Sequence, residues 1–241
     1  MRDANKFSRL AGFCRVLPRL RRRVNRDLRR PGLTHDKVVA TVVRLLEMTL
    51  IRIGNDEYAR QNRSYGLTTL KDRHATVRGN TVRFHFRGKS GVEVEAEATD
   101  RRVARIVKQL QELPGQDLFT YVDDSGESRA VTSQDVNTYL RETTGADYTA
   151  KDFRTWSATV LAAAALHEVE GFETEAEAKR NVVKAIDRVA RRLGNTRAVC
   201  RNSYVHPAIV DSYMNRSLPE SGSATTAVEQ AVLSLLTRRK R

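Results

Sequence analysis

Thr81-Val82-Arg83-Phe84-His85-Phe86-Arg87 places an apolar residue at every second position and a basic residue at most of the positions between. This period of two is typical of a strand with one buried and one exposed face. Val92-Glu93-Val94-Glu95-Ala96-Glu97-Ala98 has the same period with acidic residues. The turn residues Gly79-Asn80 and Gly88-Lys89-Ser90-Gly91 lie before and between these runs. The pattern predicts an antiparallel sheet of about three strands over residues 73–98, with Lys89 at a hairpin tip.

The triplet Gly88-Lys89-Ser90 also ends like a phosphate-binding P-loop, and this alternative fails on two counts. The P-loop pattern needs a glycine where Arg83 stands. It also needs a helix after the triplet, whereas a strand pattern follows.

The regions on both sides of the sheet have helical periodicity. Residues 1–30 carry eleven Lys or Arg against two Asp and predict one or two basic helices, ended by Pro31-Gly32. Thr34 is a predicted N-cap for a helix over residues 35–50. Further helices are predicted at 100–113, 134–143, 151–170, 174–193 and 207–215, with a last one after residue 223, and a loop is expected between residues 114 and 126. The fold class is therefore mainly α with a small three-stranded antiparallel sheet, an α+β fold.

The charge balance indicates a polyanionic partner. The 241 residues include 43 Lys or Arg and 29 Asp or Glu, a formal net charge of +14. Basic side chains that neutralise phosphates release condensed counterions, which favours binding to nucleic acid. No apolar run reaches the ~18 residues of a transmembrane helix, so we expect no membrane partner.

Cysteine and histidine usage gives no indication of a metal site. There are two cysteines, Cys14 and Cys200, without CxxC spacing, and none of the five histidines stands in an HExxH pattern. This usage favours a reducing compartment over a disulfide framework. We expect neither a metal nor another cofactor.

Three further segments carry residues suited to chemistry on a phosphate. Ile51-Arg52-Ile53 flanks an arginine with apolar residues, and a buried guanidinium needs an anionic partner, either a carboxylate or a ligand phosphate. Lys151-Asp152-Phe153-Arg154-Thr155-Trp156 begins a predicted helix. Gly194-Asn195-Thr196-Arg197-Ala198-Val199-Cys200-Arg201-Asn202-Ser203-Tyr204 starts with a glycine suited to closing the preceding helix and ends on a tyrosine.

Together these segments resemble the type IB DNA topoisomerases, over roughly residues 35–215 and in the same order. The run from Ile51 to Tyr58, followed by Gly66-Leu67-Thr68-Thr69-Leu70 and His74, is similar to the opening of that family's catalytic domain. Phe86-Arg87-Gly88-Lys89 resembles its lysine hairpin. The segments that hold Arg154 and Tyr204 resemble its second arginine motif and its nucleophile segment.

The resemblance implies a catalytic role for each of five residues. Tyr204 would attack a DNA phosphodiester and form a 3′-phosphotyrosyl ester, and Arg52 and Arg154 would hold the non-bridging oxygens. Lys89 would protonate the leaving 5′-oxygen as the general acid. Asn195 stands where the family commonly has histidine, so only a neutral hydrogen bond to the phosphate is carried over. The family positions of Tyr58 and Lys151 imply contacts with DNA.

These inferences predict a DNA topoisomerase of type IB that relaxes supercoiled DNA without ATP or metal. A tyrosine recombinase is one alternative, although that family usually has His-x-x-Arg where Lys151 precedes Arg154 here. A basic protein that coats DNA without chemistry is the other alternative.

We expect residues 1–241 to form one catalytic domain, with a basic helical part (1–72), the sheet (73–98) and a second helical part (99–241). We expect no counterpart of the family's N-terminal β clamp domain in these residues. The expected setting is a bacterial cytoplasm, at the nucleoid, with a monomer acting on double-stranded DNA.

Overall fold

The computed structural model describes residues 7–169, 171–222 and 224–238, which form two compact units. One unit consists of residues 17–150, and the other of the described residues in 1–16 and 151–241. The three consecutive parts named from the sequence do not coincide with these units, because the sheet shares its unit with helices on both sides of it in the chain.

The sheet of residues 17–150 has the predicted topology. Strands β1 (Ala75–Arg78), β2 (Thr81–Arg87) and β3 (Glu93–Thr99) pair antiparallel in the order β1-β2-β3. Along β2 the apolar side chains Val82, Phe84 and Phe86 are buried, and the basic side chains between them are exposed. The period of two therefore predicted both the strand and its buried face correctly.

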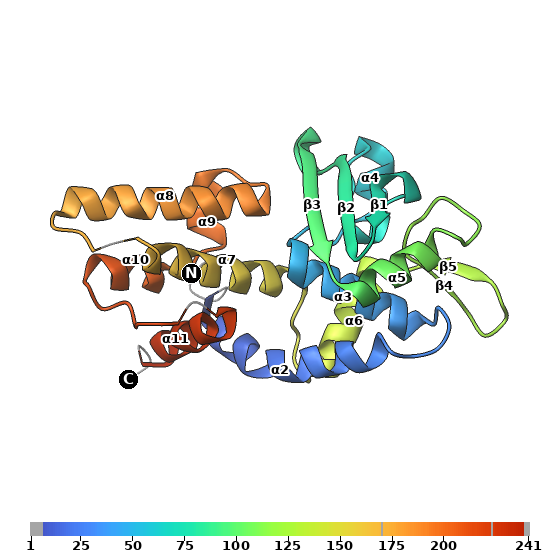
Figure 1. Ribbon diagram of the computed structural model, residues 1–241, viewed down its shortest axis with the longest axis horizontal. Coiled ribbons are helices and arrows are strands. Elements are labelled where there is room, and N and C mark those ends of the chain that lie inside the picture. Colours follow the sequence, from blue (N-terminus) through green and yellow to red (C-terminus); the bar gives the residue numbers. More distant parts are fainter. Residues whose placement is uncertain (1–6, 170, 223, 239–241) are drawn as a thin grey trace. The chain divides into compact units, whose positions relative to one another are not determined.

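Helices α3 (His35–Thr49) and α5 (Arg101–Leu110) pack against this sheet (Figure 1). The N-cap of α5 is Asp100, whose carboxylate accepts hydrogen bonds from two backbone N–H groups. Helix α3 is buried on more than one face, since Val39 and Val43 are buried as well as Val38 and Val42. The reason is that α3 also contacts α6 (Ser133–Thr144), the 3₁₀ helix η1 (Leu67–Thr69) and strand β4 (Thr120–Val122).

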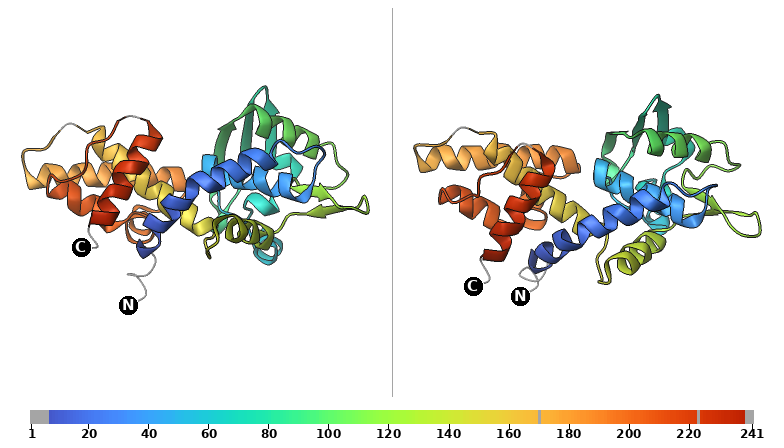
Figure 2. Two further views of the ribbon diagram at one scale, coloured as in Figure 1. Left: turned by 90° about the horizontal axis from the view of Figure 1, so that it is seen from below. Right: turned by 60° about the horizontal axis from the view of Figure 1, so that its bottom comes forward.

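A second, two-stranded sheet corrects the predicted loop between residues 114 and 126. Strands β4 (Thr120–Val122) and β5 (Ser128–Ala130) form a hairpin that projects from its unit in both views of Figure 2. Strands of three residues are too short to show a period in the sequence. The Asp123 carboxylate closes the turn by accepting hydrogen bonds from the N–H groups of Ser125 and Glu127.

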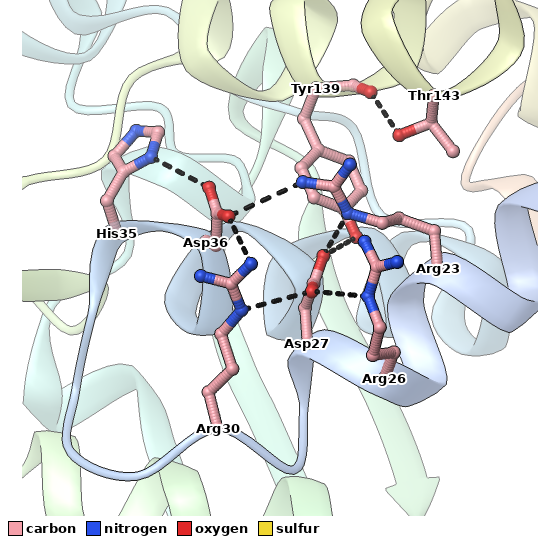
Figure 3. Close-up of polar contacts among 8 residues, drawn as sticks. All are labelled: Arg23, Arg26, Asp27, Arg30, His35, Asp36, Tyr139 and Thr143. Atoms are coloured by element: carbon pink, nitrogen blue, oxygen red, sulfur yellow. Dashed lines mark hydrogen bonds and ion pairs between the residues drawn. The ribbon is translucent and has the colours of Figure 1, made fainter.

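A buried carboxylate joins residues of three helices within the range 17–150 (Figure 3). Asp27, at the end of α2 (Leu10–Asp27), is fully buried and accepts hydrogen bonds from Arg23 Nε at 2.5 Å and Tyr139 Oη at 2.9 Å. Arg30 bridges Asp27 and Asp36, at 3.1 Å from each. Burial on its own raises the pKa of Asp27, but the hydrogen bonds from Arg23 and Tyr139 outweigh it and lower that pKa. The network ties α2 to α3 and α6.

The other unit is helical in its described part. It contains α7 (Ala150–His167), α8 (Glu175–Leu193), α9 (Arg197–Ser203), α10 (Pro207–Met214) and α11 (Thr225–Arg238) (Figure 1). Helix α7 supplies much of the core, including Phe153 and Trp156, and the Trp156 indole N–H lies 3.4 Å from the Glu229 carboxylate on α11. Trp156 and Cys200 are both buried in this core. The sequence did not predict α9 as a separate helix.

Candidate active site

Arg52 lies on an irregular segment that is held by its backbone. The Arg52 carbonyl accepts a hydrogen bond from Leu67 N at 2.9 Å. The next carbonyl, that of Ile53, accepts from Thr68 N at 2.7 Å and from Thr68 Oγ1 at 2.9 Å. Two segments more than ten residues apart in the sequence are thereby joined, and the half-buried Arg52 side chain starts from a fixed backbone.

Two glycines make this close approach possible. A Cβ atom added to Gly66 would lie 2.6 Å from both the Arg52 carbonyl oxygen and the Gly54 nitrogen. Gly54 has φ +108, and an added Cβ there would lie 2.9 Å from Thr68 Oγ1. Heavy atoms do not approach this closely without displacement. The run Gly66-Leu67-Thr68-Thr69 is therefore needed to hold the backbone of Arg52 in this position.

A cavity of about 360 Å³ opens in front of Arg52. Tyr58, Ser64, Tyr65 and Lys89 contribute to its lining together with Arg52. The structure thus brings together three of the residues that the sequence singled out, namely Arg52, Tyr58 and Lys89. Two cationic side chains and two tyrosines around an open cavity suit an anionic ligand with apolar parts, such as a nucleotide strand.

Lys89 stands at the tip of the β2–β3 hairpin, as predicted, and is exposed. The tip is closed by hydrogen bonds from Gly88 N to Val92 O at 2.8 Å and from Gly91 N to Gly88 O at 3.1 Å. Beside the tip, at the last residue of β2, Tyr65 N donates to Arg87 O at 2.8 Å. This last bond ties the lysine hairpin to the segment that seats Arg52.

Tyr58 lies on the short helix α4 (Asp56–Asn62), and 37% of its surface is exposed. The Asn55 side chain caps this helix by accepting a hydrogen bond from Tyr58 N at 2.8 Å. An exposed tyrosine beside a cationic cavity is suited to a ligand contact rather than to core packing.

His74 contacts Tyr65, one of the residues that line the cavity. Its ring lies 4.5 Å from that of Tyr65, and its Nδ1 accepts a hydrogen bond from Lys71 N at 3.0 Å. Burial, reinforced by the charges of Arg73 and Lys71, lowers the pKa of His74 to about 4. His74 is therefore a neutral, structural residue at physiological pH.

Arg154 and Tyr204 meet in the helical unit. Arg154 is 4% exposed, and its Nη2 donates a hydrogen bond to the Leu193 carbonyl oxygen at 2.9 Å. Its central carbon lies 5.4 Å from the centre of the Tyr204 ring, within the range of a cation–π contact. A permanent positive charge thus lies beside the phenol ring.

Tyr204 follows the last residue of α9 and is half-buried. Thr196 begins this helix as its N-cap, its side chain accepting from Val199 N. The Tyr204 N–H donates to Cys200 O at 3.0 Å, and the Tyr204 carbonyl oxygen lies 3.2 Å from the Thr159 hydroxyl on α7. Bonds to both α9 and α7 therefore set the backbone of this residue.

Asn195 and Lys151 lie in the same unit. Gly194 ends α8 with φ 59, as predicted, and Asn195 N donates to Ala190 O at 3.0 Å. The Asn195 side chain is half-buried just after Leu193, whose carbonyl holds Arg154. Lys151 is exposed in the first turn of α7.

The predicted residues thus divide into two sets, one in each unit. Arg52, Tyr58 and Lys89 belong to residues 17–150, and Lys151, Arg154, Asn195 and Tyr204 belong to the helical unit. Sequence reasoning missed Tyr65, Thr159 and the Leu193 carbonyl. No pattern indicates the last two, because their roles are contacts between distant residues, whereas Tyr65 could have been noticed beside the Gly66 motif.

Neither set contains a constellation of metal ligands. Within residues 7–169, 171–222 and 224–238, no three His, Cys, Asp or Glu side chains are grouped so that they could hold a metal ion. In the same ranges, no helix combines the length and the apolar character needed to cross a membrane.

Comparison with known proteins identifies relatives over most of the chain. The profile of a family described as "Eukaryotic DNA topoisomerase I, catalytic core" matches residues 1–228. The DNA topoisomerase 1B of Acanthamoeba polyphaga mimivirus is 30% identical over 220 residues, which are 88% of this chain and 66% of the viral protein. The DNA topoisomerase 1B of vaccinia virus (strain Copenhagen) is 20% identical over 216 residues, 88% of this chain and 65% of that protein.

A fungal relative is matched over a smaller part of its length. The DNA topoisomerase 1 of Mycosarcoma maydis is 24% identical over 186 residues, which are 70% of this chain and 18% of the fungal protein. The chain therefore spans at most about two thirds of the relatives it matches.

Proposed function

The chain belongs to the DNA topoisomerase I catalytic-core family, and from this premise we propose that it is a type IB DNA topoisomerase, which relaxes supercoiled duplex DNA. The observation that carries the proposal is the contact between Arg154 and Tyr204, 5.4 Å from guanidinium carbon to ring centre. A tyrosine nucleophile needs a fixed positive charge where its oxygen and the phosphate meet, and Arg154 supplies one.

The proposed reaction is a reversible exchange of phosphodiester bonds. The Tyr204 phenol gives its proton to water and its oxygen forms a bond to phosphorus, while the bond from phosphorus to the 5′-oxygen breaks. Lys89 gives a proton to the departing 5′-oxygen. The 3′-phosphotyrosyl ester conserves the bond energy, so attack by the 5′-hydroxyl restores the DNA strand without ATP.

The arginines and Asn195 act on the phosphate oxygens in this proposal. Arg52 and Arg154 hold the two non-bridging oxygens, where negative charge grows in the transition state, because a guanidinium stays charged and donates two parallel hydrogen bonds. Asn195 adds a neutral hydrogen bond through its amide. Tyr58 and Lys151 contact the DNA backbone in this proposal.

In this proposal Arg52 and Lys89, from residues 17–150, and Arg154 and Tyr204, from the helical unit, all act on the bound DNA strand. The net charge of +14 supports a duplex DNA substrate. A monomer acting at a bacterial nucleoid is part of the same proposal.

Plasmid relaxation tests the proposal. Supercoiled plasmid is incubated with the wild-type chain in EDTA without ATP, and topoisomers are resolved on an agarose gel. We expect relaxation by the wild type and none by Tyr204→Phe, with Tyr121→Phe, a half-buried tyrosine on β4, as the matched control that retains activity. DNA binding without relaxation by the wild type would instead support a coating protein, and exchange of strands between two duplexes would support a recombinase.

A further inference from the structure

The Thr159 hydroxyl lies at a junction between α7 and the nucleophile segment. Thr159 is fully buried, and its Oγ1 lies 2.8 Å from the Thr155 carbonyl oxygen one turn earlier in α7. The same Oγ1 lies 3.2 Å from the Tyr204 carbonyl oxygen and accepts a hydrogen bond from His206 N at 3.1 Å. One hydroxyl therefore contacts the backbone on both sides of Val205.

The backbone at Tyr204 needs such support because it is irregular. Tyr204 has φ −129 and ψ −30, which is neither helical nor extended. The N–H groups of Tyr204 and Val205 both donate to Cys200 O, each at 3.0 Å. These two bonds fix the N–H groups of Tyr204 and Val205. Thr159 contacts the groups that follow them, the Tyr204 carbonyl oxygen and the His206 N–H.

Helix α7 also carries Arg154, five residues before Thr159. At a rise of 1.5 Å per residue these two positions are about 7.5 Å apart along a rigid helix. Arg154 contacts the ring of Tyr204, and Thr159 contacts its backbone. The two contacts fix the ring and the backbone of Tyr204 relative to the same helix. Together they define the direction in which the tyrosine side chain points.

We propose that Thr159 is a positioning residue for the nucleophile, which holds the Tyr204 backbone at a fixed place relative to the Arg154 guanidinium through its hydroxyl. This inference rests on the proposed function and assigns Thr159 no contact with DNA. Small displacements of a reacting group cost large factors in rate, so loss of the hydroxyl slows bond formation at phosphorus rather than DNA binding.

A matched pair of threonines separates this role from helix stability. Thr41 on α3 is also fully buried, and its Oγ1 lies 2.8 Å from the carbonyl oxygen one turn earlier, that of Lys37. Thr41→Val and Thr159→Val therefore remove the same intrahelical bond from equally buried sites. The contacts with residues 204 and 206 are specific to Thr159.

The test measures single-turnover formation of the covalent protein–DNA adduct on a duplex oligonucleotide at saturating protein, together with the Kd for that duplex. We expect Thr159→Val to form the adduct about tenfold more slowly than wild type, with an unchanged Kd, Thr159→Ser to stay within about twofold, and Thr41→Val to match the wild type. Thr159→Ser and Thr159→Ala both lack the methyl group and differ only in the hydroxyl. If Thr159→Val fails to fold, Thr159→Ala and Thr159→Ser are compared instead. Adduct formation about tenfold slower with Thr159→Ala than with Thr159→Ser supports the proposal.

The outcomes distinguish the two levels of inference. Equal adduct rates for Thr159→Val and Thr41→Val, or for the Ser and Ala variants, would overturn the role of Thr159 and leave the proposed function intact. Absence of any adduct with the wild-type chain would overturn the proposed function itself.

Discussion

The backbones of Gly66 and Arg52 are so close that a methyl group on Gly66 would lie 2.6 Å from the Arg52 carbonyl oxygen. Gly66 itself has an extended backbone (φ −147), so the requirement for glycine is one of space and not of conformation. The two segments are further tied by the bond from Leu67 N to Arg52 O. Any side chain at position 66 must therefore push the Arg52 segment away.

Gly66→Ala should destabilise its unit by about 1–3 kcal/mol, the usual cost of overpacking, and should reduce DNA relaxation at temperatures where the protein remains folded. Thermal unfolding and plasmid relaxation measure the two effects. Gly171→Ala is the matched control, because an added Cβ there meets nothing within 4 Å. Equal activity of the two variants would contradict the seating of Arg52 by Gly66.

Arg154→Ala should slow covalent adduct formation by on the order of 10²–10³, the typical cost of removing one preorganised charged donor. Arg154→Lys should recover little, because a lysine cannot hold the Leu193 carbonyl and present a planar fork to the phosphate together. Rapid-quench kinetics on an oligonucleotide measure the rates. Arg180→Ala, an exposed arginine on α8, serves as the control. A Lys variant as fast as wild type would exclude a bidentate role.

Lys89→Ala should slow cleavage of ordinary DNA by about 10²–10⁴, the range for loss of general-acid catalysis. A substrate with a 5′-phosphorothiolate at the cleavage site has a leaving group that needs little protonation. On that substrate the Lys89→Ala rate should approach the wild-type rate. A variant that stays equally slow on both substrates would show that Lys89 does not act as the general acid.

Asp27→Asn should lower the free energy of unfolding by about 3 kcal/mol, because it leaves the Arg23 and Arg30 guanidinium groups without their shared buried carboxylate. Urea unfolding followed by far-ultraviolet circular dichroism measures the change. Asp124→Asn, at an exposed loop position, should change stability little. Equal stabilities of the two variants would mean that the network of Figure 3 contributes nothing net.

Acidification should destabilise the cavity region through His74. The pKa of His74 is lowered from 6.5 to about 4, so the unfolded chain takes up a proton at a higher pH than the folded one. The stability from neutral His74 is complete above pH 6.5 and is lost progressively as the pH falls towards 4. Between pH 7 and pH 5 the expected loss is about 2 kcal/mol.

The same urea titrations at pH 7 and pH 5 check this effect. His74→Gln keeps a neutral polar side chain and should be less stable at pH 7 but less sensitive to the change of pH. A variant whose stability falls as steeply as that of the wild type would assign the pH dependence to other groups.

Much of the local structure was predictable from the residues. The alternation in residues 81–87 predicted β2 and its buried face, and Asp100 and Gly194 marked helix ends that the structure confirms. Such features depend on neighbours in the chain, so their signals are local. The β4–β5 hairpin escaped prediction because strands of three residues are too short to show an alternation. Helix α9 escaped because its seven residues make only about two helical turns.

For the candidate site, sequence reasoning named Arg52, Lys89, Arg154 and Tyr204, and their catalytic roles remain predictions. Sequence reasoning could not identify the contacts that hold these residues in place. The bond of Arg154 to the Leu193 carbonyl, the contact of Gly66 with Arg52 and the bridge from Thr159 to Tyr204 each join residues more than ten positions apart.

The family, the chemical types of the site residues and the α+β pattern could be predicted from the residues alone, because each depends on residue identity or on local period. Which backbone atoms hold Arg52, Arg154 and Tyr204 became known with the fold, because the positions of these atoms follow from how the helices and strands pack. Thr159 illustrates the difference. In the sequence it is one threonine within an apolar run, and in the fold its buried hydroxyl reaches the backbone of Tyr204.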